Sequence, residues 1–334
     1  MTSPDIADLA IRVMAGERRA LARAITLVES TRKDHRIQSD ELLQRIGRDN
    51  SVAAPKSLRI GLSGTPGVGK STFIEALGMR LVARGLKIAV LAVDPSSARS
   101  GGSILGDKTR MELLSRQSNA FIRPSPSQSE LGGVARRTRE AIRLVEAAGF
   151  DIVLVETVGV GQSETMVSEM TDIFTLLIAP AGGDELQGVK RGIMEIADLI
   201  VINKADGALA PVARSTMSDY AGALRLLRKR EGDPEGFPRA LTTSSVTGDG
   251  LDEVWAAITE LDAWRRASSH HTARRAAQSR LWLSRALERG AVEMVTRHPG
   301  VAGALRDLEA DVAQGRLSAE AAADQLLAAF RAEE

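Results

Sequence analysis

The segment from Gly64 to Ser71 has the residue types and spacing of a phosphate-binding loop. It reads GTPGVGKS and matches the pattern G-x-x-x-x-G-K-[ST] at every position. Its glycines let the backbone approach closely, so that N–H groups at a helix start can surround a β-phosphate. Lys70 would place a charge between the β- and γ-phosphates, and the Ser71 hydroxyl would bind Mg²⁺. The predicted nucleotide-binding residues of this loop are Gly64, Thr65, Pro66, Gly67, Val68, Gly69, Lys70, Ser71 and Thr72.

Two carboxylates end apolar runs of the kind that form buried strands. Asp94 follows KIAVLAV, and Glu156 follows DIVLV and begins the segment Glu156-Thr157-Val158-Gly159. Ligands of open α/β sheets gather outside the carboxyl ends of the strands. A carboxylate there, three residues before a glycine, is suited to bind Mg²⁺ and to respond to a γ-phosphate. Either residue alone is equally compatible with capping the next helix. Beside a phosphate-binding loop, the pair favours a metal site.

A second motif, Asn203-Lys204-Ala205-Asp206, follows the apolar run DLIVIN. Asp206 is able to accept hydrogen bonds from the N1–H and 2-amino groups of guanine, whereas adenine would leave this carboxylate unpaired. Lys204 would lie along the plane of the base, and Asn203 would brace the loop. Backbone N–H groups of Ser244, Ser245 and Val246 would close over the guanine O6 atom. The motif therefore predicts GTP rather than ATP as the ligand.

These residues need a sheet that brings them to one edge. Continuous apolar runs suit strands that are buried on both faces of a parallel sheet. Six such runs are predicted strands, at 58–63, 87–93, 151–156, 172–178, 198–203 and 239–245. Helical patterns lie at 70–84, 107–117, 130–148, 185–197, 210–230 and 249–266. Their alternation predicts a doubly wound α/β domain with a mostly parallel sheet over residues 57–266.

The segments on either side of this domain are predicted to be helical. Residues 1–56 form an N-terminal extension with two helices between residues 6 and 46, separated near Gly16. Residues 267–334 form a C-terminal region whose apolar stripes, which include Leu283 and Leu287, need a surface to pack on. That surface is either the chain's own domain or a second copy, and we expect a homodimer.

The composition excludes several classes of protein. The 334 residues hold 44 Lys and Arg against 43 Asp and Glu, so a net charge of +1 predicts no nucleic-acid or membrane partner. With no cysteine, disulfides, thiolate nucleophiles and Cys-ligated metals are excluded. No run of 18 apolar residues is present and the N-terminus lacks an apolar signal core, so a cytoplasmic protein is expected. The pair His270-His271 more simply begins a solvated basic helix than a metal site.

Together these motifs resemble those of the MeaB/ArgK GTPases, a family that includes the human methylmalonic aciduria type A protein. The resemblance rests on segments such as GTPGVGKST, SGGSILGDKTRM, VETVGVGQSE and VINKAD, and it covers nearly the whole chain. It implies a GTP-hydrolysing homodimeric chaperone that gates adenosylcobalamin delivery to methylmalonyl-CoA mutase, or to a related acyl-CoA mutase, and protects that enzyme. An adenosyltransferase would be a further partner. The resemblance also implies that Asp107 joins Ser71, Asp94 and Glu156 as Mg²⁺ ligands.

The residues around Gly159 predict slow hydrolysis by the isolated protein. Ras-like enzymes place a water-orienting glutamine directly after this glycine, whereas here Val160 follows it and Gln162 comes two residues later. We expect a partner to raise the rate by repositioning Lys190 or its neighbours Asp184 and Gln187. Lys70, Asp94, Glu156 and Lys190 are thus the predicted catalytic residues.

Three other functions stay open. One is a P-loop kinase or ATPase of arginine and ornithine transport, and another is a GTPase that serves a different metallocofactor enzyme. The last is a scaffold that binds GTP without hydrolysing it. The Asn203–Asp206 motif weighs against the first, and intact Lys70, Ser71 and Glu156 weigh against the last.

Overall fold

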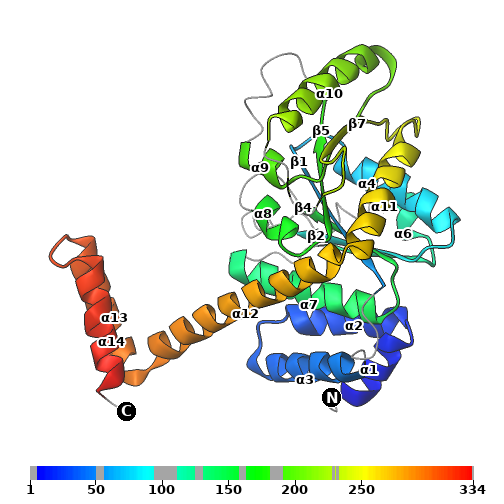
Figure 1. Ribbon diagram of the computed structural model, residues 1–334. Helices are drawn as coiled ribbons and strands as arrows, with labels where there is room; N and C mark the ends of the chain where they lie inside the picture. Colours follow the sequence, from blue (N-terminus) through cyan, green and yellow to red (C-terminus); the bar gives the residue numbers. More distant parts are fainter. Residues whose placement is uncertain are drawn as a thin grey trace. The chain divides into compact units, whose positions relative to one another are not determined.

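The protein is described by a computed structural model over residues 6–49, 56–93, 111–124, 131–157, 163–180, 191–227, 230 and 233–332. Between residues 58 and 242 the chain forms a seven-stranded sheet in the order β3-β2-β4-β1-β5-β6-β7 (Figure 1). Every neighbouring pair is parallel, which confirms the predicted α/β fold class. The strands are β1 (Leu58–Gly64), β2 (Ile88–Val93), β3 (Ala120–Arg123), β4 (Ile152–Thr157), β5 (Ile173–Ile178), β6 (Leu199–Ile202) and β7 (Arg239–Thr242).

Helices cover both faces of the sheet. The helices described up to residue 267 are α1 (Ile6–Met14), α2 (Arg18–Glu29), α3 (Lys33–Asp49), α4 (Lys70–Ala83), α6 (Glu112–Ser115), α7 (Leu131–Ala147), α8 (Ser163–Ser168), α9 (Arg191–Ile196), the 3-10 turn η1 (Gly207–Leu209), α10 (Ala210–Arg225) and α11 (Leu251–Ala267). Alternate β1 residues, such as Ile60 and Leu62, pack with α4, α6 and α11 in one buried apolar cluster. On the other face Gly61 lies against α8, where a Cβ atom would come within 2.8 Å of Val167 and Thr171. This glycine lets α8 pack directly on the central strand.

Some predicted boundaries were wrong. Residues 6–46 hold parts of three helices rather than two, because Ser30 adopts an extended conformation that ends α2. Strand β3 was not predicted, since its four residues at the sheet edge are too short for a clear apolar run. Two elements end earlier than expected: the helix that begins at residue 210 ends at Arg225, and the last strand ends at Thr242.

Three aspartates make the same pair of contacts at the amino ends of strands. Each aspartate directly precedes a strand and makes two hydrogen bonds with one residue at or just before the start of the adjacent strand. Its backbone N–H donates to the carbonyl oxygen of that residue, and its Oδ2 accepts a hydrogen bond from the backbone N–H of the same residue. The six N···O distances are all 2.8 or 2.9 Å. These three pairs, here called the aspartate brackets, are Asp151 with Lys87, Asp172 with Arg59, and Asp198 with Phe174.

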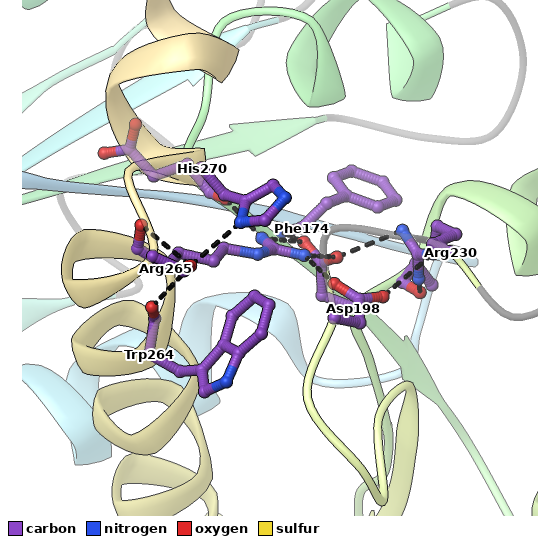
Figure 2. Close-up of polar contacts among 10 residues, drawn as sticks. Phe174, Asp198, Arg230, Trp264, Arg265 and His270 are labelled. Atoms are coloured by element: carbon purple, nitrogen blue, oxygen red, sulfur yellow. Dashed lines mark hydrogen bonds and ion pairs between the residues drawn. The ribbon is translucent and has the colours of Figure 1, made fainter.

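Asp198 also belongs to a buried ion-pair cluster at this edge (Figure 2). Arg265 of α11 donates to Asp198 at 2.7 Å and to Asp233 at 2.6 Å, and Arg230 donates to Asp198 at 3.1 Å. Burial by itself would lower the pKa of Arg265, but the charges and hydrogen bonds of the two aspartates raise it above its ordinary value. Removing Arg265 would leave two buried carboxylates poorly compensated, a change that costs about 3–5 kcal/mol.

The chain forms two compact units, one up to His271 and one from Thr272 onward. In the first, α2 and α3 pack against α7, and Arg123 of β3 pairs with Glu29 of α2. The second contains most of α12 (His270–Arg297) together with α13 (Pro299–Ala313) and α14 (Ala319–Arg331). Within it α13 packs on α14, with the rings of His298 and Phe330 edge to face at 5.0 Å. None of the described helices is both long enough and apolar enough to cross a membrane.

Candidate nucleotide-binding site

The predicted phosphate-binding loop connects β1 to α4, so the loop N–H groups meet the start of a helix. Two of its glycines are required by their surroundings. Gly64 has φ +153°, and a Cβ atom there would overlap the Leu177 carbonyl oxygen. Gly69 has φ +91°, and a Cβ atom there would lie 2.8 Å from Asn203 Nδ2. The Val68 side chain is buried in the apolar cluster and anchors the loop from within.

Lys70 is the first residue of α4 and is 9% exposed. Its Nζ donates to the carbonyl oxygens of Gly64 at 2.6 Å and Thr65 at 3.2 Å. Burial lowers the pKa of Lys70, while the negative charges of Glu156 and Glu164 oppose that shift. A partly desolvated ammonium at a helix start is suited to meet an anionic ligand, because the ligand's charge would replace the lost hydration.

Two buried carboxylates act on Lys70. Glu156 lies in β4, beside Leu62 of β1, and is 4% exposed. Glu164 of α8 is completely buried. Glu164 was not predicted as a site residue: it ends the segment VETVGVGQSE, but no pattern in the sequence indicated a role for this position in the site. Its burial and its charge on Lys70 emerge only from the fold.

The predicted metal ligands fall partly within the described residues. Ser71 lies in the first turn of α4, and with Glu156 it offers the hard oxygen donors that Mg²⁺ prefers. These two residues therefore fit the ion. Asp94 and Asp107 lie outside the described residues, as do Val160, Gln162, Asp184, Gln187 and Lys190. In the described part of the chain, no group of three or more His, Asp or Glu side chains is arranged to hold a metal by itself.

The segment predicted to recognise guanine is bonded directly to the phosphate-binding loop. Asn203, 1% exposed, donates from Nδ2 to the Val68 carbonyl oxygen at 3.0 Å. Lys204, in the left-handed region at φ +59°, donates from Nζ to the Gly67 carbonyl oxygen at 2.7 Å. The structure thus brings together the two motifs that the sequence placed more than a hundred residues apart.

The loop from Ser244 to Val246 is held by hydrogen bonds within the protein. Its three N–H groups all have acceptors inside the protein: Ser244 donates to the Asp249 carbonyl at 2.8 Å, Ser245 to Asn203 Oδ1 at 3.2 Å, and Val246 to Ser244 Oγ at 3.3 Å. The contact of these groups with guanine O6 therefore stays a prediction. The side chains of the loop also form hydrogen bonds within the site. The Ser244 hydroxyl donates to Asp206 Oδ2, and the Ser245 hydroxyl donates to Asn203 Oδ1 at 2.7 Å.

Comparison with known proteins agrees with this arrangement. The family model described as "Methylmalonyl Co-A mutase-associated GTPase MeaB" matches residues 21–299. The chain belongs to the MeaB family. Among its relatives is the mouse protein "Methylmalonic aciduria type A homolog, mitochondrial", 48% identical over 325 residues that cover 96% of this chain and 78% of the mouse protein. The "GTPase ArgK" of Escherichia coli is 50% identical over 283 residues, or 85% of this chain and 84% of that protein.

A solved structure extends the likeness to three dimensions. The crystal structure of a protein named "LAO/AO transport system kinase" aligns with a TM-score of 0.76 and 38% identity over 99% of both chains. Membership of the MeaB family makes this chain a P-loop GTPase that binds guanine nucleotides. In this MeaB-family chain, hydrogen bonds join the predicted phosphate loop to the Asn203–Asp206 segment.

Proposed function

We propose that this chain is a GTP-hydrolysing chaperone of an adenosylcobalamin-dependent acyl-CoA mutase, with methylmalonyl-CoA mutase as the first candidate. It gates cofactor delivery, acts beside an adenosyltransferase in the cytoplasm, and protects the mutase. The observation that carries this proposal is the match of residues 21–299 to a family described by its association with that mutase. The name of the mouse relative, which refers to methylmalonic aciduria, supports it.

In the proposed mechanism, the N–H groups of residues 64–72 and the Lys70 ammonium bind the phosphates, and Asp206 binds the guanine. Ser71 and Glu156 would hold Mg²⁺, with Asp94 and Asp107 as proposed further ligands. When bound, Mg²⁺ neutralises charge on the β- and γ-phosphate oxygens. Lys70, moving from its loop carbonyls to the phosphate oxygens, stabilises the charge that develops there.

The proposed partner effect follows from the lack of a glutamine after Gly159. With Val160 in that position, we propose that mutase binding brings Lys190, or Asp184 and Gln187, to the reacting phosphate. Supplying one charge-stabilising group can raise hydrolysis by several orders of magnitude. The stimulation is therefore expected to exceed tenfold.

The test measures phosphate release at saturating GTP with and without each candidate mutase. Lys190→Ala is expected to lose most of the stimulation. Lys87→Ala, which removes an exposed lysine at the opposite edge of the sheet, is the matched control and is expected to keep it. If no mutase changes the rate, the chaperone proposal fails although GTP hydrolysis stands.

We also propose that the second compact unit forms a homodimer contact. On α12, Leu283 and Leu287 are each 71% exposed and stand one helical turn apart, and Val292 and Met294 are exposed nearby. Apolar stripes of this kind on a helix are stabilised when a second copy covers them.

An alternative function as a transport-system kinase takes its support from the name of the solved relative. It predicts that radioactive phosphate from the γ-position appears on an amino acid or a protein. The chaperone proposal predicts that all of it appears as free phosphate.

A further inference from the structure

Arg80, in the third turn of α4, reaches the turn between β7 and α11. Its Nη2 donates to the Gly248 carbonyl oxygen at 2.8 Å, and its Nη1 pairs with Asp252 in the first turn of α11. Gly248 has φ +85°, and a Cβ atom there would collide with the Arg80 guanidinium. The guanidinium is therefore packed against the turn as well as bonded to it.

The turn that Arg80 contacts is the one that fixes Ser244. The Gly248 N–H donates to the Ser244 carbonyl oxygen at 2.9 Å, and the Thr247 N–H donates to Ser244 Oγ at 3.1 Å. The Ser244 hydroxyl in turn donates to Asp206 Oδ2. A continuous series of contacts thus runs from Arg80 through Gly248 and Ser244 to Asp206.

We propose that Arg80 is a positioning residue for guanine recognition, acting through Gly248 and Ser244 to hold Asp206 in its base-binding orientation. The inference rests on the proposed role of Asp206 in binding guanine. Because Lys70 begins the same helix that carries Arg80, α4 contacts the phosphate-binding loop at one end and supports the base-binding residue from its third turn. Half-exposed ion pairs contribute little to folding stability, so the effect is expected in ligand binding rather than in the stability of the fold.

Arg84 provides a matched control one turn along α4. Its Nη2 donates to Asp252 Oδ1 at 2.7 Å, so it shares the carboxylate partner of Arg80. Among the contacts of the described residues, it makes none with the turn that carries Gly248. Replacing either arginine with methionine removes the same charge and keeps a long apolar stem, but only Arg80→Met loses the hydrogen bond to Gly248.

The test uses the full chain and compares GDP with IDP, whose base lacks the 2-amino group. Dissociation constants are measured by calorimetry, and KM and kcat for GTP by phosphate release. Arg80→Met is expected to weaken GDP binding about fivefold, the effect of losing one hydrogen bond. The Arg80→Met variant should also show a smaller ratio of GDP affinity to IDP affinity. Its KM for GTP should rise, while its kcat changes less than about twofold. Arg84→Met is expected to keep all of these values within about twofold of the wild type, and Arg80→Lys, which retains a donor, to recover part of the loss.

Two results would overturn the role of Arg80 and leave the assignment of Asp206 intact. One is equal effects of Arg80→Met and Arg84→Met, and the other is an Arg80→Met variant that weakens GDP and IDP binding by the same factor. The second would mean that Arg80 does not act through Asp206. A wild-type protein that binds GDP no better than ADP would overturn the assignment of Asp206 itself, and the role of Arg80 with it.

Discussion

Asn203 donates a hydrogen bond from Nδ2 to the carbonyl oxygen of Val68, a residue 135 positions earlier in the chain. The bond is shielded, since Asn203 is 1% exposed. Next to it, Lys204 donates to the Gly67 carbonyl oxygen. The phosphate-binding loop and the proposed guanine-binding segment are therefore one hydrogen-bonded unit before a nucleotide arrives, and part of the ordering cost of binding is already met by the fold.

Replacing Asn203 with alanine is expected to weaken both this unit and nucleotide binding. The Val68 carbonyl and the Ser245 donors would be left buried without Asn203, which costs about 1–3 kcal/mol of folding stability. Calorimetry should show GDP affinity reduced by about tenfold, and the thermal midpoint should fall by several degrees. Asn119→Ala, on the turn before β3, is the control, and an equal loss in both variants would contradict the prediction.

Lys70→Ala is expected to reduce GTP hydrolysis by more than about tenfold, because the ammonium stabilises charge that develops in the transition state. The fold should survive. Burial lowers the pKa of Lys70, so the charged side chain is already held at a cost in the folded protein. Phosphate release and a thermal unfolding scan measure the two effects. Unchanged turnover would show that the phosphate-binding loop is not the working site.

Asp206→Asn is expected to move the base preference from guanine toward xanthine. The new amide keeps an oxygen that can accept from the Ser244 hydroxyl, and its nitrogen can donate to the C2 carbonyl of xanthine. In the wild type, GDP should bind at least about a hundredfold more tightly than ADP, because adenine would leave the half-buried Asp206 carboxylate unpaired in the complex. Calorimetry with GDP, XDP and ADP tests both statements, and equal ADP and GDP affinities in the wild type would reject the guanine assignment.

A chain that ends at His271 is expected to be monomeric and still to bind GDP, because the first compact unit ends there. In the full chain, Leu283→Glu together with Leu287→Glu should also give a monomer, since both leucines are 71% exposed on α12. Ile37→Glu, at a 72% exposed position of α3, is the control. Light scattering decides the matter, and a dimer that persists in the truncated chain would place the contact elsewhere.

Glu140 of α7 gives a pH-dependent prediction. Its Oε1 pairs with Arg136 at 3.1 Å, while its Oε2 is buried with no hydrogen-bond partner in the described part of the chain. Burial raises the pKa of Glu140, and the charge of Arg136 opposes this only in part. Between the unfolded and the raised folded pKa the folded state binds more protons, so this group lowers stability as pH rises through that window.

Glu140→Gln should therefore be more stable than the wild type at neutral pH, and the difference should vanish as pH falls below the ordinary carboxyl pKa. Urea midpoints measured across this range provide the check. Glu41→Gln, which removes an exposed carboxylate paired with Arg45, is the control. A Glu140→Gln variant that is less stable at neutral pH would show that the Arg136 pair outweighs the cost of burial.

Local patterns predicted most of the sheet and the two nucleotide motifs, because long apolar runs and glycine-rich loops are defined by neighbouring residues. Strand β3 was not predicted because its four residues are too short for a clear apolar run, and the pairing of Arg123 with Glu29 of α2 joins residues far apart in sequence. The break at Ser30 was missed because one extended residue changes no periodicity. Glu164 and Arg80 were missed for a related reason, since their significance lies in which distant residues they face.

The aspartate brackets affect how firmly the strands keep their register when the loops at the proposed nucleotide site change conformation. They join β2 to β4, β1 to β5 and β5 to β6, each at the amino end of the strands. A shift of one residue between paired strands would exchange their two faces, and the brackets oppose such a shift with side-chain as well as backbone bonds. Strand alignment is thereby set by the protein's own atoms at the end remote from the ligand. If the proposed nucleotide site lies at the other end of the strands, these three alignments are held by bonds that involve no ligand.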